Sequence, residues 1–109
     1  MKKVSVGMVG AGFMGKLHSI AFTIHPMHFW PVAARPVLKE IVDISEDIAK
    51  DAALKYGYER YSVDWQAMVR KNDIDLVDVI TPNNTHKEII LEAIKNKKDV
   101  LYLINSGKY

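Results

Sequence analysis

The hydrophobic and polar positions of this chain follow two alternating periods. Short, mostly apolar runs rich in β-branched residues are typical of buried strands, and they fall at 3–9, 37–43, 75–81 and 99–104. Between these runs apolar residues recur every three or four positions, which is the spacing of one helix face. Helices are therefore expected after residue 12, after residue 45, over 64–71 and after residue 85, with a short extended piece at 59–61.

Local signals set the expected ends of the helices. The apolar face of the first helix comprises Phe13, Leu17, Ile20, Ala21 and Ile24. Proline interrupts helices, so Pro26 is expected to end this one and to open a long connection over 25–36.

Two later helices carry capping signals. Ser45 is the expected N-cap of the second helix and Gly57 its stop. Thr85 and Glu88 have the spacing of a capping box, so the last helix is expected to begin after Thr85.

Strands and helices alternate through the whole chain, which favours a parallel sheet covered on both faces. The sequence predicts one doubly wound α/β domain, a Rossmann fold, over residues 1–109. No internal repeat or linker divides it, and 49% hydrophobic residues suffice for a core.

Composition narrows the classes of partner. The 15 basic and 13 acidic residues nearly balance, so nothing favours nucleic acid, and Lys95, Lys97 and Lys98 fit a solvated helix end. The chain has no cysteine, and His25 and His28 lack a third ligand, so no metal site is expected. No run approaches the roughly 18 apolar residues of a membrane span. We expect a soluble, cytoplasmic protein.

The stretch 9–15, VGAGFMG, contains G-x-G-x-x-G between a predicted strand and a predicted helix. Gly10 permits the tight turn, Gly12 lets the backbone approach a pyrophosphate, and Gly15 lets helix and strand pack closely. The N-terminus of the following helix offers free N–H groups and a positive dipole end to phosphates. The sequence therefore predicts a dinucleotide site.

A carboxylate at the end of the second strand would accept hydrogen bonds from the adenosine ribose, and Asp43 has that position. It would repel a 2′-phosphate, which favours NAD over NADP, and Ser45 could bind a ribose hydroxyl. The alternative is that Asp43 only begins the turn at Ser45. In the loop TPNNTH, 81–86, Asn83 either binds the cofactor or only forms the turn, and His86 is a site residue or an ordinary surface residue.

The chain resembles the Gfo/Idh/MocA family of glucose–fructose oxidoreductase and inositol dehydrogenase. The resemblance rests on VGMVGAGFMGKLHSIAF, IVDISEDIAKDAALKYG and DIDLVDVITPNNTHKEIILEAIKNKKDV, which cover nearly the whole chain. Members are NAD(P)-dependent and many oxidise a sugar or cyclitol hydroxyl. Their N-terminal Rossmann domain is followed by a larger substrate domain. The resemblance implies cofactor contacts at Gly10, Gly12, Phe13, Met14, Gly15, Asp43, Thr81, Pro82, Asn83 and His86.

The resemblance ends at the last strand. The family continues with Glu-Lys-Pro, whose lysine assists proton transfer, whereas this chain has Leu103, Ile104 and Asn105 there. We expect a Rossmann domain truncated before its last strand, with the family's C-terminal substrate domain absent, and we assign no catalytic residue. Such a chain would bind the dinucleotide without catalysis, as one part of an NAD(P)-dependent oxidoreductase, and would self-associate through its uncovered sheet edge. The alternative is a stand-alone, non-catalytic NAD-binding or assembly module.

Overall fold

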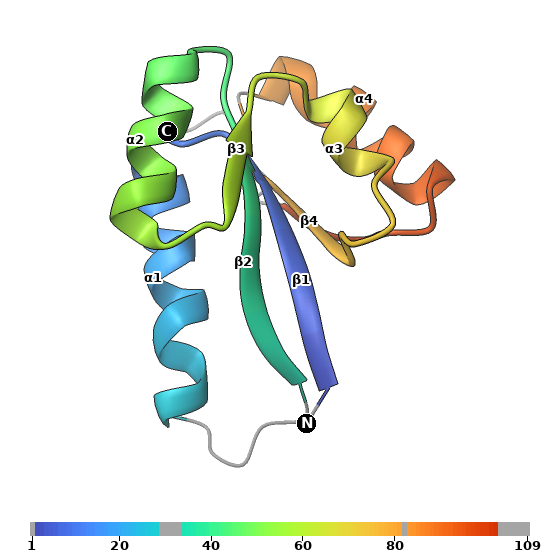
Figure 1. The fold of residues 1–109 in the computed structure, drawn as a ribbon. Helices are drawn as coiled ribbons and strands as arrows, with labels where there is room; N and C mark the ends of the chain where they lie inside the picture. Colours follow the sequence, from blue (N-terminus) through green and yellow to red (C-terminus); the bar gives the residue numbers. More distant parts are fainter. Residues whose placement is uncertain (1, 29–33, 82, 103–109) are drawn as a thin grey trace.

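The computed structural model describes residues 2–28, 34–81 and 83–102, and these residues form an α/β fold (Figure 1). Strands and helices alternate along the chain. In order they are β1 (Lys2–Val9), α1 (Phe13–His28), β2 (Ala34–Val42), α2 (Glu46–Tyr56), β3 (Arg60–Ser62), α3 (Trp65–Val69), β4 (Leu76–Val79), α4 (Asn83–Lys95) and β5 (Asp99–Tyr102).

The strands form one parallel sheet in the order β3-β2-β1-β4-β5. The chain starts in the middle, runs outward to β3 and then crosses to β4 on the other side of β1. The carboxyl ends of β1 and β4 therefore lie side by side at the point where the strand order reverses, which is where ligands bind in such sheets. The predicted doubly wound Rossmann fold is confirmed.

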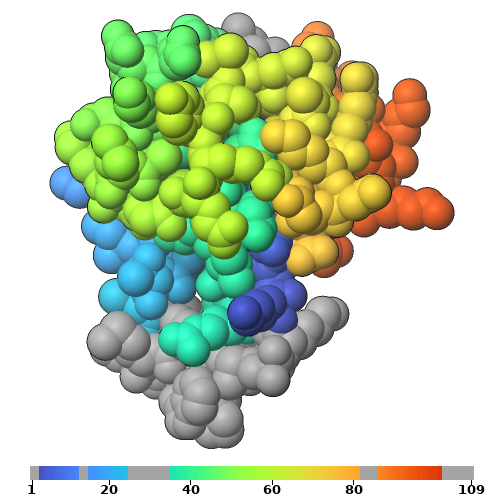
Figure 2. Space-filling view, in the orientation of Figure 1, coloured from blue at the N-terminus to red at the C-terminus, as the bar shows by residue number. Residues whose placement is uncertain are grey.

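Helices cover both faces of the sheet, as Figure 1 shows. Met8 and Ile41 face the α1 and α2 side, where they form a buried cluster with Ala52, Ala53 and Tyr58. A larger apolar cluster lies on the α3 and α4 side and comprises Val9, Val42, Met68, Val69, Ile74, Val77, Val79, Ile89 and Ala93. In the space-filling view α2, β3 and α3 form a continuous surface, beneath which β1 and β2 emerge (Figure 2).

The expected connection over 25–36 is shorter in the structure because regular elements extend into it from both sides. Helix α1 continues through Pro26 to His28, since a proline in the last turn keeps a helical φ and removes only one hydrogen bond. Strand β2 begins at Ala34 and includes Pro36, which pairs with Val4 of β1. Strand β3 pairs only with Glu40–Val42, so Pro36 lies where β2 is an edge strand within the described residues.

The apolar face predicted for α1 is not the face that packs on the sheet. Leu17, Ile20, Ala21 and Ile24 are exposed, whereas Gly15 and Ser19 are buried. The close approach of Gly15 to the end of β1 sets the rotation of the helix, and this rotation turns the large aliphatic residues outward. The side chain of Phe13 lies outside the described part of the structure.

The predicted caps of α2 are confirmed, whereas the predicted N-cap of α4 is wrong. The hydroxyl of Ser45 accepts from Ile48 N at 3.4 Å, and Gly57 ends α2 in the left-handed conformation with φ 84°. Helix α4 begins at Asn83, so Thr85 lies inside its first turn and is not the N-cap. Several consecutive residues of TPNNTH are suitable caps, and local sequence could not select among them.

The predicted solvated helix end after α4 is also wrong in part. Lys97 adopts a left-handed φ of 61°, which reverses the chain after the helix. The ammonium group of Lys98 then turns inward and donates to the carbonyl oxygens of Lys71 and Ile74, both at 2.6 Å. Lys98 therefore caps backbone carbonyls of the α3–β4 loop.

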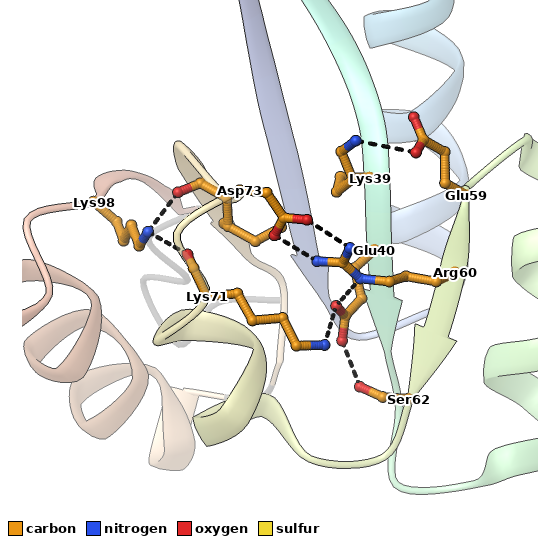
Figure 3. A network of polar contacts seen from close by, with 9 residues as sticks. Lys39, Glu40, Glu59, Arg60, Ser62, Lys71, Asp73 and Lys98 are labelled. Atoms are coloured by element: carbon orange, nitrogen blue, oxygen red, sulfur yellow. Dashed lines mark hydrogen bonds and ion pairs between the residues drawn. The ribbon is translucent and has the colours of Figure 1, made fainter.

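The buried carboxylate of Glu40 connects β2, β3 and the loop between α3 and β4, on the face of the sheet that α3 covers (Figure 3). Glu40 of β2 is fully buried and accepts from Lys71 Nζ at 2.8 Å, from Ser62 Oγ at 2.7 Å and from Arg60 Nε. Arg60 also forms a bidentate pair with Asp73, with both distances 2.7 Å. Burial alone would raise the pKa of Glu40, but its three donors outweigh burial and lower it.

No helix in the described ranges is long and apolar enough to span a bilayer.

Candidate functional site

The glycine loop lies at the carboxyl end of β1, where two of its positions require glycine. Gly10 has a φ of 108°, and its N–H donates to Val42 O at 2.8 Å. A Cβ on Gly15 would lie 2.7 Å from both Gly10 O and Ile80 Cδ1. The loop is thus packed against the ends of β2 and β4.

Gly12 has a different environment, because a Cβ added there would meet no atom within 4 Å. The loop therefore has open space above Gly12, at the N-terminus of α1. The helix begins with the hydrogen bond from Lys16 N to Gly12 O at 3.0 Å, so the preceding N–H groups have no acceptor within the helix. The first turn contains no acidic residue to compete with a bound anion.

Asp43 follows β2 and connects the end of that strand to the glycine loop. One carboxylate oxygen accepts from Ala11 N at 3.1 Å, and the other accepts from Ser45 N at 3.1 Å. These two bonds hold the half-buried carboxylate at the carboxyl edge of the sheet. Because a carboxylate has about four acceptor positions, Asp43 can still accept from further donors. The hydroxyl of Ser45 is engaged in capping α2.

The loop after β4 lies beside the glycine loop, since Ile80 N donates to Val9 O at 3.1 Å. Two polar atoms here are buried without a partner among the described residues, namely Thr81 Oγ1 and His86 Nε2. An unpaired buried polar atom is costly, and a ligand that bonds to it removes that cost. Both residues belong to the stretch TPNNTH.

The structure thus brings the predicted glycines, Asp43, Thr81 and His86 to one edge of the sheet. Asn83 is the first residue of α4, but its side chain, like those of Phe13 and Met14, lies outside the described part. Pro82 also lies outside it, as do Leu103, Ile104 and Asn105 at the expected Glu-Lys-Pro position. Among the described residues no group of three or more acidic or histidine side chains could hold a metal ion.

Sequence reasoning missed two apolar residues at this edge. Ile44, which follows Asp43, is 98% exposed, and Val63, which follows β3, is 52% exposed. Asp43 N donates to Ser62 O at 3.2 Å, so the ends of β2 and β3 are adjacent. An isoleucine directly before a helix cap was the available signal for this apolar surface.

The residues present fit a dinucleotide. They supply an open helix N-terminus for a pyrophosphate, a carboxylate for ribose hydroxyls and unpaired donors or acceptors beyond β4. The Gfo/Idh/MocA family model, described as an oxidoreductase family with an NAD-binding Rossmann fold, matches residues 4–102. The chain belongs to this family. It is accordingly an NAD-binding domain of the Gfo/Idh/MocA oxidoreductases.

Two of the curated proteins that this chain is similar to are dehydrogenases. Levoglucosan dehydrogenase of Pseudarthrobacter phenanthrenivorans is 41% identical over 101 residues, which are 93% of this chain and 26% of the relative. Inositol 2-dehydrogenase of Rubrobacter xylanophilus is 31% identical over 92% of this chain and 26% of that protein. The chain therefore spans about a quarter of the length of these relatives.

Solved structures agree with the assignment of this chain to the Gfo/Idh/MocA family. Levoglucosan dehydrogenase in complex with NADH superposes with a TM-score of 0.91 at 40% identity, over 93% of this chain and 27% of that one. An oxidoreductase domain protein from Kribbella flavida gives 0.88 at 32% identity, over 94% of this chain and 27% of that one. In both cases the match covers about a quarter of the solved chain.

Proposed function

We propose that this chain supplies the cofactor-binding part of an NAD-dependent dehydrogenase that oxidises a hydroxyl group of a sugar-like or cyclitol substrate. The observation that carries the proposal is that the Asp43 carboxylate accepts from Ala11 N of the glycine loop while the space above Gly12 is open, which supports a ribose site beside a pyrophosphate site. The relatives that act on levoglucosan and inositol support the substrate class.

The arrangement suggests one orientation of the cofactor. The pyrophosphate would lie over Gly12 against the N-terminus of α1, and the adenosine ribose would bond to Asp43. The exposed Ile44 and Val63 would cover the adenine. The nicotinamide half would then lie towards β4, where Thr81 Oγ1 and His86 Nε2 gain partners.

Asp43 also carries the proposed preference for NAD over NADP. Its carboxylate is held at the edge by Ala11 N and Ser45 N, so it cannot easily rotate away from a 2′-phosphate. The carboxylate and the 2′-phosphate of a bound NADP would both be negative and would repel each other. The 2′-hydroxyl of NAD would instead donate a hydrogen bond to the same carboxylate oxygen.

The proposed chemistry needs more than the cofactor site. Hydride transfer requires a substrate carbon held about 3–3.5 Å from the nicotinamide, with a base beside its hydroxyl. The relatives are about four times as long as this chain, and we propose that substrate binding and catalysis need the parts they have in addition. Incubation of the chain with NAD and either levoglucosan or myo-inositol, followed by NADH absorbance, should show no turnover. Turnover by the chain alone would contradict this.

The cofactor site is tested by calorimetric titration of NADH and NADPH into the unmodified chain and Asp43→Ala. We expect the unmodified chain to prefer NADH and Asp43→Ala to lose affinity for it by roughly tenfold, the cost of one charged hydrogen bond. Asp47→Ala is the matched control, because it removes one exposed carboxylate from the nearby first turn of α2. Equal NADH affinity in all three proteins would contradict the role given to Asp43.

We also propose self-association through the free edge of β5. In the described sheet this strand pairs only with β4, and its Leu101 is 41% exposed. An open edge with an apolar residue is a template for pairing with another chain. Sedimentation should show a concentration-dependent dimer that Leu101→Lys weakens. A monomer at all concentrations would contradict the proposal.

A further inference from the structure

The side of α1 that packs on the sheet next to the glycine loop carries small and polar residues. Of the α1 side chains that the structure describes, Gly15, His18 and Ser19 lie at the sheet, and Phe22 is the first large apolar one among them that packs there. Leu17 and Ile20, which would normally anchor such a helix, are exposed. Among the side chains that the structure describes in this part of α1, no large aliphatic one packs on the sheet, so the polar contacts that hold the helix there are of interest.

One of these contacts joins α1 to β4. His18 Nδ1 lies 2.6 Å from Asp78 Oδ2, and the Asp78 side chain is fully buried in the middle of its strand. Burial raises the pKa of Asp78, and the bond to His18 opposes this shift. Because Asp78 Oδ1 has no partner among the described residues, His18 supplies the hydrogen bonding of this carboxyl group.

The second contact joins α1 to the connection between α2 and β3. Ser19 Oγ donates to Gly15 O at 2.7 Å and lies 2.8 Å from Tyr58 OH. The serine proton is used for Gly15, so the tyrosine hydroxyl donates to Ser19 Oγ. Tyr58 is buried, and burial raises the pKa of its hydroxyl, so it remains a donor across the neutral range. This chain of bonds ends on a backbone oxygen of the glycine motif itself.

We infer that His18 and Tyr58 are positioning residues for the cofactor: through Asp78 and Ser19 they hold the glycine loop so that its N–H groups face the pyrophosphate. The inference rests on the proposed cofactor site. Hydrogen bonds are directional, so two of them from adjacent residues to different elements, β4 and the connection between α2 and β3, fix both the rotation and the depth of the helix. Aliphatic packing would permit sliding that these bonds prevent.

The test uses Tyr58→Phe, which removes only the hydroxyl, and His18→Leu, which removes the bond to Asp78. Asp78→Asn is the conservative variant, because its amide oxygen can still accept from His18. Val69→Ala is the control for general destabilisation, since Val69 lies in the cluster on the opposite face of the sheet.

Amide hydrogen exchange reports on the loop without any cofactor. Lys16 N donates to Gly12 O, so its exchange rate measures opening of the first turn of α1. We expect exchange at Lys16, relative to Val77 in β4, to rise about two- to tenfold in Tyr58→Phe and His18→Leu, as for the loss of one hydrogen bond. Asp78→Asn should be close to the unmodified chain. An unchanged ratio in both variants, or the same rise in Val69→Ala, would overturn the inference.

Titration with NADH and with ADP, which carries the pyrophosphate without nicotinamide, completes the test. Both ligands should bind about two- to tenfold more weakly to Tyr58→Phe and His18→Leu, while Val69→Ala binds them normally. Faster exchange at Lys16 with unchanged affinity would overturn the positioning role. If the unmodified chain binds neither ligand at millimolar concentration, the proposed function fails, and the exchange ratio alone decides whether the two contacts hold the loop.

Discussion

At the scale of single residues, the glycines of the loop differ in what their missing side chain permits. Gly15 has no room for a Cβ because backbone and Ile80 atoms lie at 2.7 Å, whereas Gly12 faces open space. Glycine at 15 is therefore needed by the fold, and glycine at 12 is needed only if a ligand approaches the backbone there. The two roles, both inferred from one motif, can be separated by experiment.

Gly15→Ala should destabilise the chain by about 2 kcal/mol, because the new methyl group must displace a backbone carbonyl. Gly12→Ala should change the free energy of unfolding by less than about 0.5 kcal/mol, yet weaken NADH binding more than about tenfold. Urea denaturation and calorimetric titration of both variants provide the measurements. Equal stability losses in the two variants, or normal NADH binding by Gly12→Ala, would count against this assignment.

At the scale of secondary-structure elements, α1 shows how a functional constraint overrides a hydrophobic pattern. Its aliphatic residues have helical spacing, but Gly15 must approach Gly10 and Ile80, and this contact rotates Leu17 and Ile20 outward. In helix α4 the spacing predicts a buried face of Ile89, Ile90, Ala93 and Ile94. Ile89 and Ala93 are buried and Ile90 is partly buried, whereas Ile94 is 58% exposed, so this face is confirmed except at its last residue. The same periodicity thus has different structural meanings in the two helices.

Substitution of one aliphatic residue on each helix tests this difference. Leu17→Gln should cost less than about 1 kcal/mol of unfolding free energy, because the side chain is already 41% exposed. Ile89→Ala should cost about 2–5 kcal/mol, because it leaves a cavity in the larger core cluster. Urea denaturation followed by circular dichroism would measure both. A larger loss for Leu17→Gln would mean that the predicted face of α1 packs after all.

At the scale of the whole molecule, the Glu40 network ties together segments that are far apart in the sequence. It joins β2 through Glu40 to β3 through Arg60 and Ser62, and to the α3–β4 loop through Lys71. Strand β3 has only three residues, so its ladder to β2 is short. Charged hydrogen bonds to a buried carboxylate therefore contribute much of what holds this edge of the sheet in place.

The network predicts how stability depends on pH. The pKa of Glu40 is lowered in the folded state from its usual 4.5, so its stabilising effect is complete above that value and disappears as the pH falls through the folded pKa. The pKa of Asp73 is lowered to about 2, chiefly by its bond to Arg60. The loss of stability in acid therefore continues to lower pH as Asp73 becomes protonated. At about pH 7, Glu40→Gln should cost about 2 kcal/mol, and this difference from the unmodified chain should shrink at about pH 3.

Urea denaturation at both pH values measures this effect. Glu59→Gln is the matched control, because it removes an exposed carboxylate paired with Lys39 and should cost less than about 0.5 kcal/mol. A Glu40→Gln penalty that stays the same in acid would show that the carboxylate charge contributes nothing.

The sequence by itself determined the type and order of nearly all elements, and the place of the glycine loop, Asp43 and the TPNNTH loop at one edge of the sheet. These features depend on short-range physics. Period-two and period-3.6 patterns, glycine at a positive φ and a serine cap act within a few residues, and alternating strands and helices leave few ways to connect a parallel sheet.

The tertiary structure alone decided the rotation of α1, the start of α4 and the partners of Asp78, Glu40 and Lys98. Each depends on contacts between residues far apart in the sequence: His18 and Asp78 are 60 positions apart, and Glu40 and Lys71 are 31 apart. Asp78 lies inside the apolar run DLVDVIT, and this position indicates a buried carboxyl group that needs a hydrogen-bond partner. The run does not indicate that the partner is His18. Local patterns carry no information on such partners, because the packing of helix on sheet selects them.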